Sequence, residues 1–294
     1  MAGGLKEVRQ RISSVKSTMQ ITKAMKMVSA AKLRKATDRI VQIRPYADRL
    51  NSTLVNIVGN LGGDINISYA TERPINKVLL VIVSSDKGLC GGFNSNIVKA
   101  TKILLSEKYA ELLAKRKVDF LFVGKKAADA FKGVDVYQNK EFMGLFHNLT
   151  FDSVSEAATW VMLQYERKEY DKVEVIYNQF KNAGVQYTRV EQFLPINAQE
   201  GKVKGKAVDY IFSPGKEEIL GELVPKILKT QFFRYTLDSN ASEHGARMTA
   251  MDKATENAND LLKNLTIQYN RARQAAITTE LTEIVSGAAA LSEG

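Results

Sequence analysis

A seven-residue apolar repeat runs through the first sixty residues and constrains this 294-residue chain more than any other feature. Steps of three and four residues from Leu5 reach seventeen positions up to Leu61, and fourteen of them are apolar. This pattern is typical of a coiled-coil helix, because it keeps one stripe of side chains against a partner helix. At ~1.5 Å per residue, a helix over residues 3–61 would be roughly 85 Å long. Pro45 lies inside it and can kink it, since proline removes one helical hydrogen bond.

The repeat has one polar interruption. Its three polar positions are consecutive: Thr22, Lys26 and Ser29. Over the same stretch the apolar side chains move to neighbouring positions: Ile21, Met25 and Val28. Two interpretations remain open. Either the apolar seam shifts locally, as in a stutter of a coiled coil, or this stretch faces a different partner.

A second heptad repeat lies near the end of the chain, between Leu237 and Ala276, where ten of twelve positions are apolar or aromatic. A helix over residues 216–289 would be roughly 110 Å long, with an interruption near Pro225 left open. Two terminal helices of matched period, separated by a domain, most simply pair as a long antiparallel two-helix coiled coil. Small seam residues such as Ala241 and Ala258 allow close approach.

The region between the repeats alternates strand and helix patterns. Apolar β-branched runs predict strands at 77–85, 118–124, 134–137 and 171–180, and an edge strand at 185–196. Helices are predicted from about 95 to 115, around 125–131 and at 151–169, with polar loops at 62–76 and 197–206. This order predicts a Rossmann-like α/β domain with a mainly parallel sheet and helices on both sides. The expected division is an N-terminal coiled-coil helix (1–61), the α/β domain (75–212) and a C-terminal coiled-coil helix (213–294).

Composition excludes several classes of protein. The sequence is 45% hydrophobic and 25% charged, which is ordinary for a folded soluble protein. No apolar run is long enough for a membrane span, and the first residues lack the apolar stretch of a secretory signal. Cys90 is the only cysteine, which fits a reducing compartment. With two histidines besides, the chain has almost no ligands for zinc.

A glycine-containing turn at residues 86–94 follows the first strand, where nucleotide-binding folds hold phosphate. Neither G-x-G-x-x-G nor G-x-x-x-x-G-K-[ST] is present there, so a tight turn or a protein contact is favoured. Cys90 has no nearby histidine or paired acid, and a structural role is expected. His147 and His244 are too few for a catalytic triad, and His244 falls on the coiled-coil seam. We therefore expect no catalytic site and no cofactor.

The positive charge is concentrated at one end. The chain carries a formal net charge of +10, and residues 1–50 hold twelve basic and only three acidic side chains. Such a segment is either a solvated helix face or a surface for an acidic protein, a nucleic acid or an anionic membrane. The rival functions are a basic nucleic-acid-binding protein, an enzyme built on residues 75–212, and a coiled-coil scaffold. Nucleic-acid binding explains the charge but not the sustained heptads.

Three segments resemble the gamma subunits of F-type ATP synthases: residues 21–35, the turn at 86–94, and residues 269–288. The likeness covers essentially the whole chain. It implies a non-catalytic rotor shaft in the central stalk, whose helices turn inside a ring of three alpha and three beta subunits. Rotation would couple proton translocation through the membrane sector to ATP synthesis or hydrolysis in the beta subunits. The implied partners are alpha, beta, epsilon and the c-ring, with delta as a further candidate and no nucleic acid.

The resemblance also assigns roles to individual positions. Residues matching the ring and catch-loop contacts are Met25, Lys26, Arg273, Gln274, Thr278 and Glu280. A basic N-terminal face toward an acidic loop of the beta subunit comprises Lys23, Lys32, Arg34 and Lys35. The turn at the foot of the stalk comprises Asp86, Lys87, Gly88, Gly91, Gly92 and Asn94. Near the C-terminal contacts the apolar frame changes again: Ile277, Leu281 and Ile284.

One departure from the family concerns location. Plant chloroplast relatives carry a paired-cysteine insert, which this sequence lacks, and the start of the chain shows no Arg/Ser-rich transit segment. Thiol regulation is therefore not expected. The resemblance implies a peripheral membrane protein on the cytoplasmic face of a bacterial inner membrane.

Overall fold

A computed structural model describes residues 2–60, 68–196 and 216–292. The predicted loop at 197–206, the first part (62–67) of the one at 62–76, and the domain boundaries near 61 and 213 lie outside these residues. The chain divides into two compact units: Ser29–Arg247, and Met1–Val28 together with Met248–Gly294. We call the first the body unit and the second the terminal unit, and describe each by itself.

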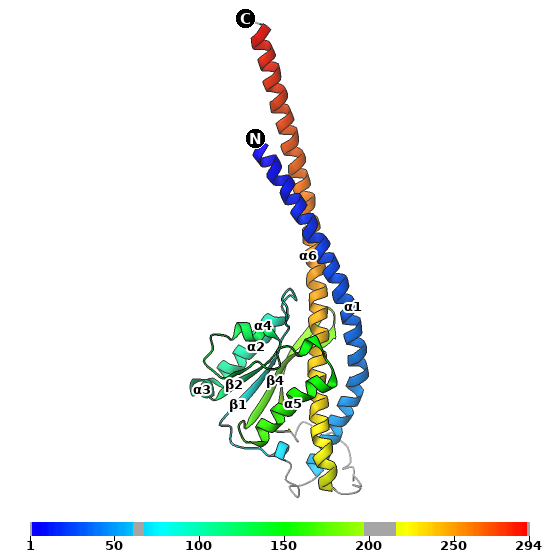
Figure 1. Cartoon of the computed structure of the whole chain (residues 1–294), viewed down its shortest axis with the longest axis vertical. Coiled ribbons are helices and arrows are strands. Elements are labelled where there is room, and N and C mark those ends of the chain that lie inside the picture. The colour runs from blue at the N-terminus through cyan, green and yellow to red at the C-terminus, as the bar shows by residue number, and fades with distance from the viewer. Residues whose placement is uncertain (1, 61–67, 197–215, 293–294) are drawn as a thin grey trace. The chain divides into compact units, whose positions relative to one another are not determined.

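Two long helices contribute to both units. Helix α1 (Ala2–Asn60) and helix α6 (Lys216–Ser292) are each continuous, with Pro45 inside one and Pro225 inside the other. The interruption considered near Pro225 is therefore absent. Within each unit the two helices lie side by side and run in opposite directions (Figure 1), as the paired heptads predict. Neither helix, over its described residues, is long and apolar enough to cross a membrane.

The body unit contains one five-stranded sheet in the order β3-β2-β1-β4-β5. Its strands are β1 (Val78–Val83), β2 (Val118–Val123), β3 (Gln138–Asn139), β4 (Lys172–Asn182) and β5 (Val185–Leu194). All neighbouring pairs are parallel except β4 and β5, which form an antiparallel hairpin at one edge. The predicted mainly parallel sheet with an edge strand is confirmed.

Helices cover both faces of this sheet (Figure 1). Alternate residues of β1 point to opposite sides: Leu79 packs with α5 (Phe151–Glu166) and α6, whereas Leu80 packs with α2 (Phe93–Glu107) and α4 (Lys125–Ala130). All six residues of β1 and all six of β2 are buried. Strands buried on both faces read as continuous apolar runs, which is why the sequence located them well.

Three local predictions were wrong. The helix expected from 95 to 115 is split into α2 and α3 (Ala110–Ala114), because Tyr109 turns into the core and Lys108 pairs with buried Glu174. The strand expected at 134–137 is a turn that buries apolar side chains, and pairing begins only at β3. Helix α5 ends three residues early, just before Lys168 adopts a positive φ of 61°.

The body unit fastens its sheet to both long helices. Ala36 and Ile40 of α1 pack on Leu237 and Ala241 of α6 in a small apolar cluster. At Gly245 of α6 the β4–β5 hairpin comes so close that a Cβ there would lie 3.2 Å from the Cα of Ala183. Close packing of this kind holds a helix firmly in place.

Candidate functional site

Two of the three polar positions that interrupt the heptad repeat, Thr22 and Lys26, lie inside the contact between the helices of the terminal unit. Thr22 is only 9% exposed, and the Thr255 hydroxyl donates to the Thr22 hydroxyl at 2.8 Å. One turn away the Lys26 ammonium pairs with the Asp252 carboxylate. The heptad frame therefore continues through polar side chains, and the interpretation that the seam shifts is wrong.

Two of the three displaced apolar residues of α1, Ile21 and Val28, face outward instead. Ile21 is 60% exposed, Met27 60% and Val28 57%, whereas Met25 is half-buried. Exposed apolar side chains that gather on one stretch of a helix mark an interaction surface. Of the two interpretations that the sequence left open, a stretch facing a different partner is the one the structure favours.

A second exposed surface lies at the C-terminal end of α6. Within the terminal unit, α6 extends beyond the N-terminal end of α1 (Figure 1). The four predicted contact residues of this region are all exposed or half-exposed: Arg273, Gln274, Thr278 and Glu280. Large apolar side chains beside them are 48–66% exposed: Ile277, Leu281, Ile284 and Val285. Polar and apolar groups thus share one accessible stretch of helix.

The predicted basic face is exposed throughout: Lys23, Lys32, Arg34 and Lys35. Lys26 differs from them, because its ammonium is held by Asp252 and its side chain is 40% exposed. The charges of the other residues remain accessible to an acidic surface.

The glycine-containing turn after β1 is rigidly built. Leu89 and Gly91 have φ angles of 61° and 56°, the left-handed region that lets the chain reverse within a few residues. The Asn94 side chain accepts a bond from the Ser85 backbone N–H at 3.1 Å, and its amide donates to the Ser85 hydroxyl at 2.8 Å. The same amide lies 3.2 Å from the Cys90 sulfur. The turn is therefore fixed by its own side chains.

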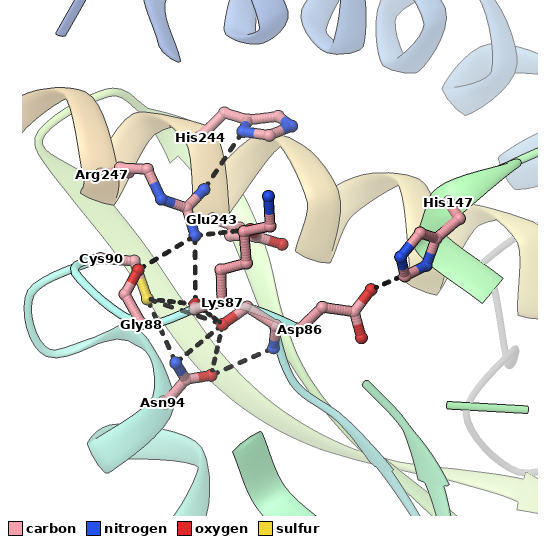
Figure 2. Close-up of polar contacts among 10 residues, drawn as sticks. Asp86, Lys87, Gly88, Cys90, Asn94, His147, Glu243, His244 and Arg247 are labelled. Carbon is pink, nitrogen blue, oxygen red and sulfur yellow. Dashed lines mark hydrogen bonds and ion pairs between the residues drawn. The ribbon is translucent and has the colours of Figure 1, made fainter. Parts of the chain in front are cut away.

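Helix α6 holds this turn from the other side (Figure 2). The Arg247 guanidinium donates to the carbonyl oxygens of Lys87 at 3.2 Å and Gly88 at 3.4 Å. Glu243, one helical turn earlier, pairs with Arg247 at 2.7 Å and is itself buried. The sequence left a tight turn and a protein contact open for this segment, and the structure shows a tight turn that α6 contacts within the body unit.

Burial is the main cause of the shifted pKa values of Cys90 and His244 near the turn. Burial raises the pKa of the Cys90 thiol, which disfavours the reactive thiolate. The nearest histidine to Asp86 is His147, 3.4 Å away and two-thirds exposed. Burial, then the charges of Arg247 and Lys32, lower the pKa of His244 to about 4. Across the described ranges, no three His, Cys, Asp or Glu side chains converge as a metal site.

Several residues that build these surfaces were missed from the sequence. Asp252 and Thr255 complete the polar seam, and the seam position of Thr255 opposite Thr22 was the available signal. Glu243 and Arg247 have the four-residue spacing of a helical ion pair. Nothing in that spacing indicates the backbone carbonyls that Arg247 binds.

Comparisons with known proteins agree over the full length. A family model described as ATP synthase matches residues 4–291. The ATP synthase gamma chain of Cytophaga hutchinsonii is 58% identical over 290 residues, 98% of either chain. That of Flavobacterium johnsoniae is 50% identical, again over 98% of either chain.

Solved structures give the same match. A chain from the central stalk and c-ring structure of the Tetrahymena thermophila mitochondrial ATP synthase is 27% identical, with a TM-score of 0.57 over 80% of this chain and 99% of that one. A chain of the Euglena gracilis mitochondrial ATP synthase, 21% identical, shares the fold with a TM-score of 0.67 over 99% of this chain and 95% of that one.

Proposed function

The chain belongs to the gamma chain family of ATP synthase, and from that premise we propose that it is the rotor subunit of the central stalk. It couples proton translocation through the membrane sector to ATP synthesis and hydrolysis. The catalytic sites belong to the beta subunits of the surrounding ring of three alpha and three beta subunits. This chain is a non-catalytic subunit of that complex.

The observation that carries the proposal is a set of charged contacts that joins the sheet of the body unit to both long helices. Arg44 of α1 binds Asp238 of α6 and the carbonyl oxygen of Phe180 on β4. Arg234 of α6 binds Asp48 of α1 at 2.8 Å and Glu191 of β5 at 3.4 Å. A torque applied to the sheet would therefore reach both helices through charged contacts rather than through one flexible linker.

Exposed apolar surfaces on the terminal unit support a role for the shaft inside the ring. A shaft that carries apolar groups on only part of its circumference presents a different face to each of three similar neighbours. Each neighbour's open–closed equilibrium then shifts by its differential contact energy. A difference of ~1.4 kcal/mol changes a nucleotide affinity about tenfold, so a few weak contacts suffice.

We assign the individual contacts as follows. The ring and catch-loop contacts are Met25, the exposed part of Lys26, Arg273, Gln274, Thr278 and Glu280. The acidic loop of the beta subunit faces the exposed basic residues: Lys23, Lys32, Arg34 and Lys35. The turn at 86–94 lies at the foot of the stalk, toward the epsilon subunit and the c-ring. The division into two helical segments (1–61 and 213–294) around an α/β domain (75–212) is part of the same proposal.

The complex is bound to a membrane, and this chain is a peripheral part of it. We place it on the cytoplasmic face of a bacterial inner membrane. Support comes from the end-to-end match to the gamma chain of Cytophaga hutchinsonii.

Reconstitution tests the function. The full chain is mixed with alpha and beta subunits from the same source, the product is purified by size, and ATP hydrolysis is assayed. We expect one complex of three alpha, three beta and one copy of this chain, with sustained hydrolysis that depends on it. Absence of a complex under conditions that preserve the ring would contradict the proposal and direct attention to nucleic-acid binding.

Coupling is tested with Met25→Lys in the membrane-bound complex. A new charge at the ring contact should reduce proton pumping per ATP hydrolysed. Arg167→Ala, an exposed substitution on the α/β domain, is the control and should leave the ratio unchanged. A normal ratio in Met25→Lys would remove that residue from the contact surface.

A further inference from the structure

A groove with a positively charged lining opens in the body unit between α1, the segment before α5, and α6. One cavity of about 300 Å³ is bordered by Lys32, Lys35 and Arg39 of α1, by residues 146–150, and by Asn240 and His244 of α6. A second cavity of about 270 Å³ shares Lys32 and His244 with it and continues to Lys87 and Arg247. We call the first cavity and its border the basic groove.

The basic groove has cations without acids. Its border includes three fixed positive charges and two histidines but no Asp or Glu. In the part of the chain that the structure describes, no salt bridge joins Lys32, Lys35 or Arg39 to a carboxylate. Arg39 is positioned by one bond from its Nη1 to the Leu149 carbonyl oxygen at 3.3 Å, which leaves its other N–H groups available.

The acids of the neighbouring cavity are engaged in part (Figure 2). Glu243 is paired with Arg247, and one Asp86 oxygen lies 3.4 Å from His147. The other Asp86 oxygen is buried without a hydrogen-bond partner, so that end of the second cavity suits a donor. An anion would therefore settle in the basic groove, away from Asp86.

The cations around the groove also act on His244. Its lowered pKa has burial as the largest cause, followed by the charges of Arg247 and Lys32. A neutral imidazole held next to cations shows that additional positive charge is unfavourable at this place. Burial disfavours charge of either sign, so only the contribution of the two cations favours an anion over a cation here.

We propose that the basic groove binds a small oxyanion of the phosphate class, with Lys32, Lys35 and Arg39 as its charged donors. Guanidinium and ammonium groups are the side chains that bind phosphate oxygens best. The side chain of Asn240 can add a neutral hydrogen bond, whereas the Thr150 hydroxyl is already bonded to Ser153 at the start of α5. A volume of about 300 Å³ is at the lower limit of small-molecule pockets, and it matches inorganic phosphate or pyrophosphate better than a whole nucleotide. This inference concerns the separate chain, in which Lys32 and Lys35 are exposed, and does not depend on the rotor function.

The test uses the full chain and observes the histidine imidazoles by NMR at constant ionic strength. Inorganic phosphate or pyrophosphate is titrated against sodium chloride as the reference. We expect saturable binding in the millimolar range, accompanied by a rise in the pKa of His244. Lys99→Gln, at an exposed position of α2, is the control and should not change the binding. Lys35→Gln and Arg39→Gln should each weaken binding three- to tenfold, and Lys35→Arg should restore it.

Three outcomes would overturn the proposal. The first is a titration that does not saturate, or that chloride reproduces. The second is equal affinity in the wild type and in the Lys35→Gln and Arg39→Gln variants. The third is ADP binding more tightly than pyrophosphate at these residues, which would make the groove a nucleotide site. Because all three substituted residues are exposed, loss of folding does not confuse these results.

Discussion

Arg44 and Asp238 join the two long helices through a carboxylate that is almost completely buried. The Asp238 side chain is 2% exposed and that of Arg44 is 35% exposed. The same Arg44 nitrogen also donates to the Phe180 carbonyl oxygen at 2.6 Å. Since α1, α6 and β4 meet at one guanidinium, this pair connects the sheet to both helices.

Arg44→Met should destabilise the chain by about 3 kcal/mol, because it leaves a buried carboxylate unpaired. Chemical denaturation measures the free energy of unfolding. The double variant Arg44→Met with Asp238→Asn is the control and should regain part of the loss, since the buried charge is gone. A single variant as stable as the wild type would show that the pair does not hold the helices.

The loss in Arg44→Met should depend on pH. Burial raises the pKa of Asp238, and Arg44 opposes that rise. A raised folded-state pKa means that ionisation of Asp238 costs stability as the pH rises above the ordinary value of about 4. Without Arg44 the pKa rises further, so the difference from wild type should be largest at neutral pH and shrink below about pH 4. A difference that is constant with pH would contradict this explanation.

The seam of the terminal unit should draw its stability from apolar side chains rather than from its ion pair. Leu265 is 6% exposed, so Leu265→Ala should cost about 2–3 kcal/mol. The side chains of Lys26 and Asp252 are 40% and 44% exposed, and Asp252→Asn should cost less than about 1 kcal/mol. Denaturation of both variants compares them directly. Equal losses would mean that the ion pair is stronger than its exposure indicates.

Arg247→Gln should loosen the turn at 86–94. Two carbonyl bonds from a charged donor are lost, each worth about 1.5–3 kcal/mol, and buried Glu243 is left without its partner. Backbone hydrogen exchange in this turn should become at least tenfold faster. Glu243→Gln is the matched control, because it retains Arg247 and should change exchange less. Unchanged hydrogen exchange in Arg247→Gln would show that the contacts within the turn are sufficient to fix it.

His244 should make the folded chain less stable in mild acid. Its pKa is lowered from 6.5 to about 4, so the unfolded chain binds a proton more readily. The stability that its neutral form contributes is present above pH 6.5 and is lost as the pH falls from 6.5 to about 4. His244→Gln should flatten the stability profile between these pH values, whereas Lys99→Gln, at an exposed position of α2, should not. If stability depends on pH as steeply in His244→Gln as in the wild type, other groups cause that dependence.

Arg273→Ala should impair the assembled complex without affecting the fold. If the contact contributes about 1.4 kcal/mol to the differential binding of one catalytic state, steady-state ATP hydrolysis falls about tenfold. Gln274→Ala should act in the same direction. Circular dichroism of the separate chain should match the wild type because both side chains are exposed. Unchanged turnover in the complex would exclude these residues from the contact surface.

The heptads and the apolar strands made most of the fold predictable. Both signals are periodic, so helices α1 and α6 and strands β1 and β2 were located within a few residues. The errors arose where a single tertiary contact overrides the pattern. Lys108 leaves the helical path to reach Glu174, and the strand expected at 134–137 gives way to a turn that buries Val134 and Val136 in part.

The surfaces were less predictable than the fold. The exposed residues at the end of α6 follow from a change of frame, which a sequence shows directly. Whether Thr22 and Lys26 faced inward could not be decided, because a threonine or a lysine stem fits a seam or a surface equally well. Only the opposing Thr255 and Asp252 settle it.

The two polar contacts in the terminal unit also fix how far one helix can slide along the other. Apolar seam residues are nearly interchangeable, so a displacement by one heptad would lose little packing. The same slide would carry Thr22 opposite Leu262 and part the Lys26 ammonium from Asp252, leaving polar groups against apolar ones. A rotating shaft under load must keep its two helices in a fixed register. The Thr22–Thr255 and Lys26–Asp252 contacts select that register.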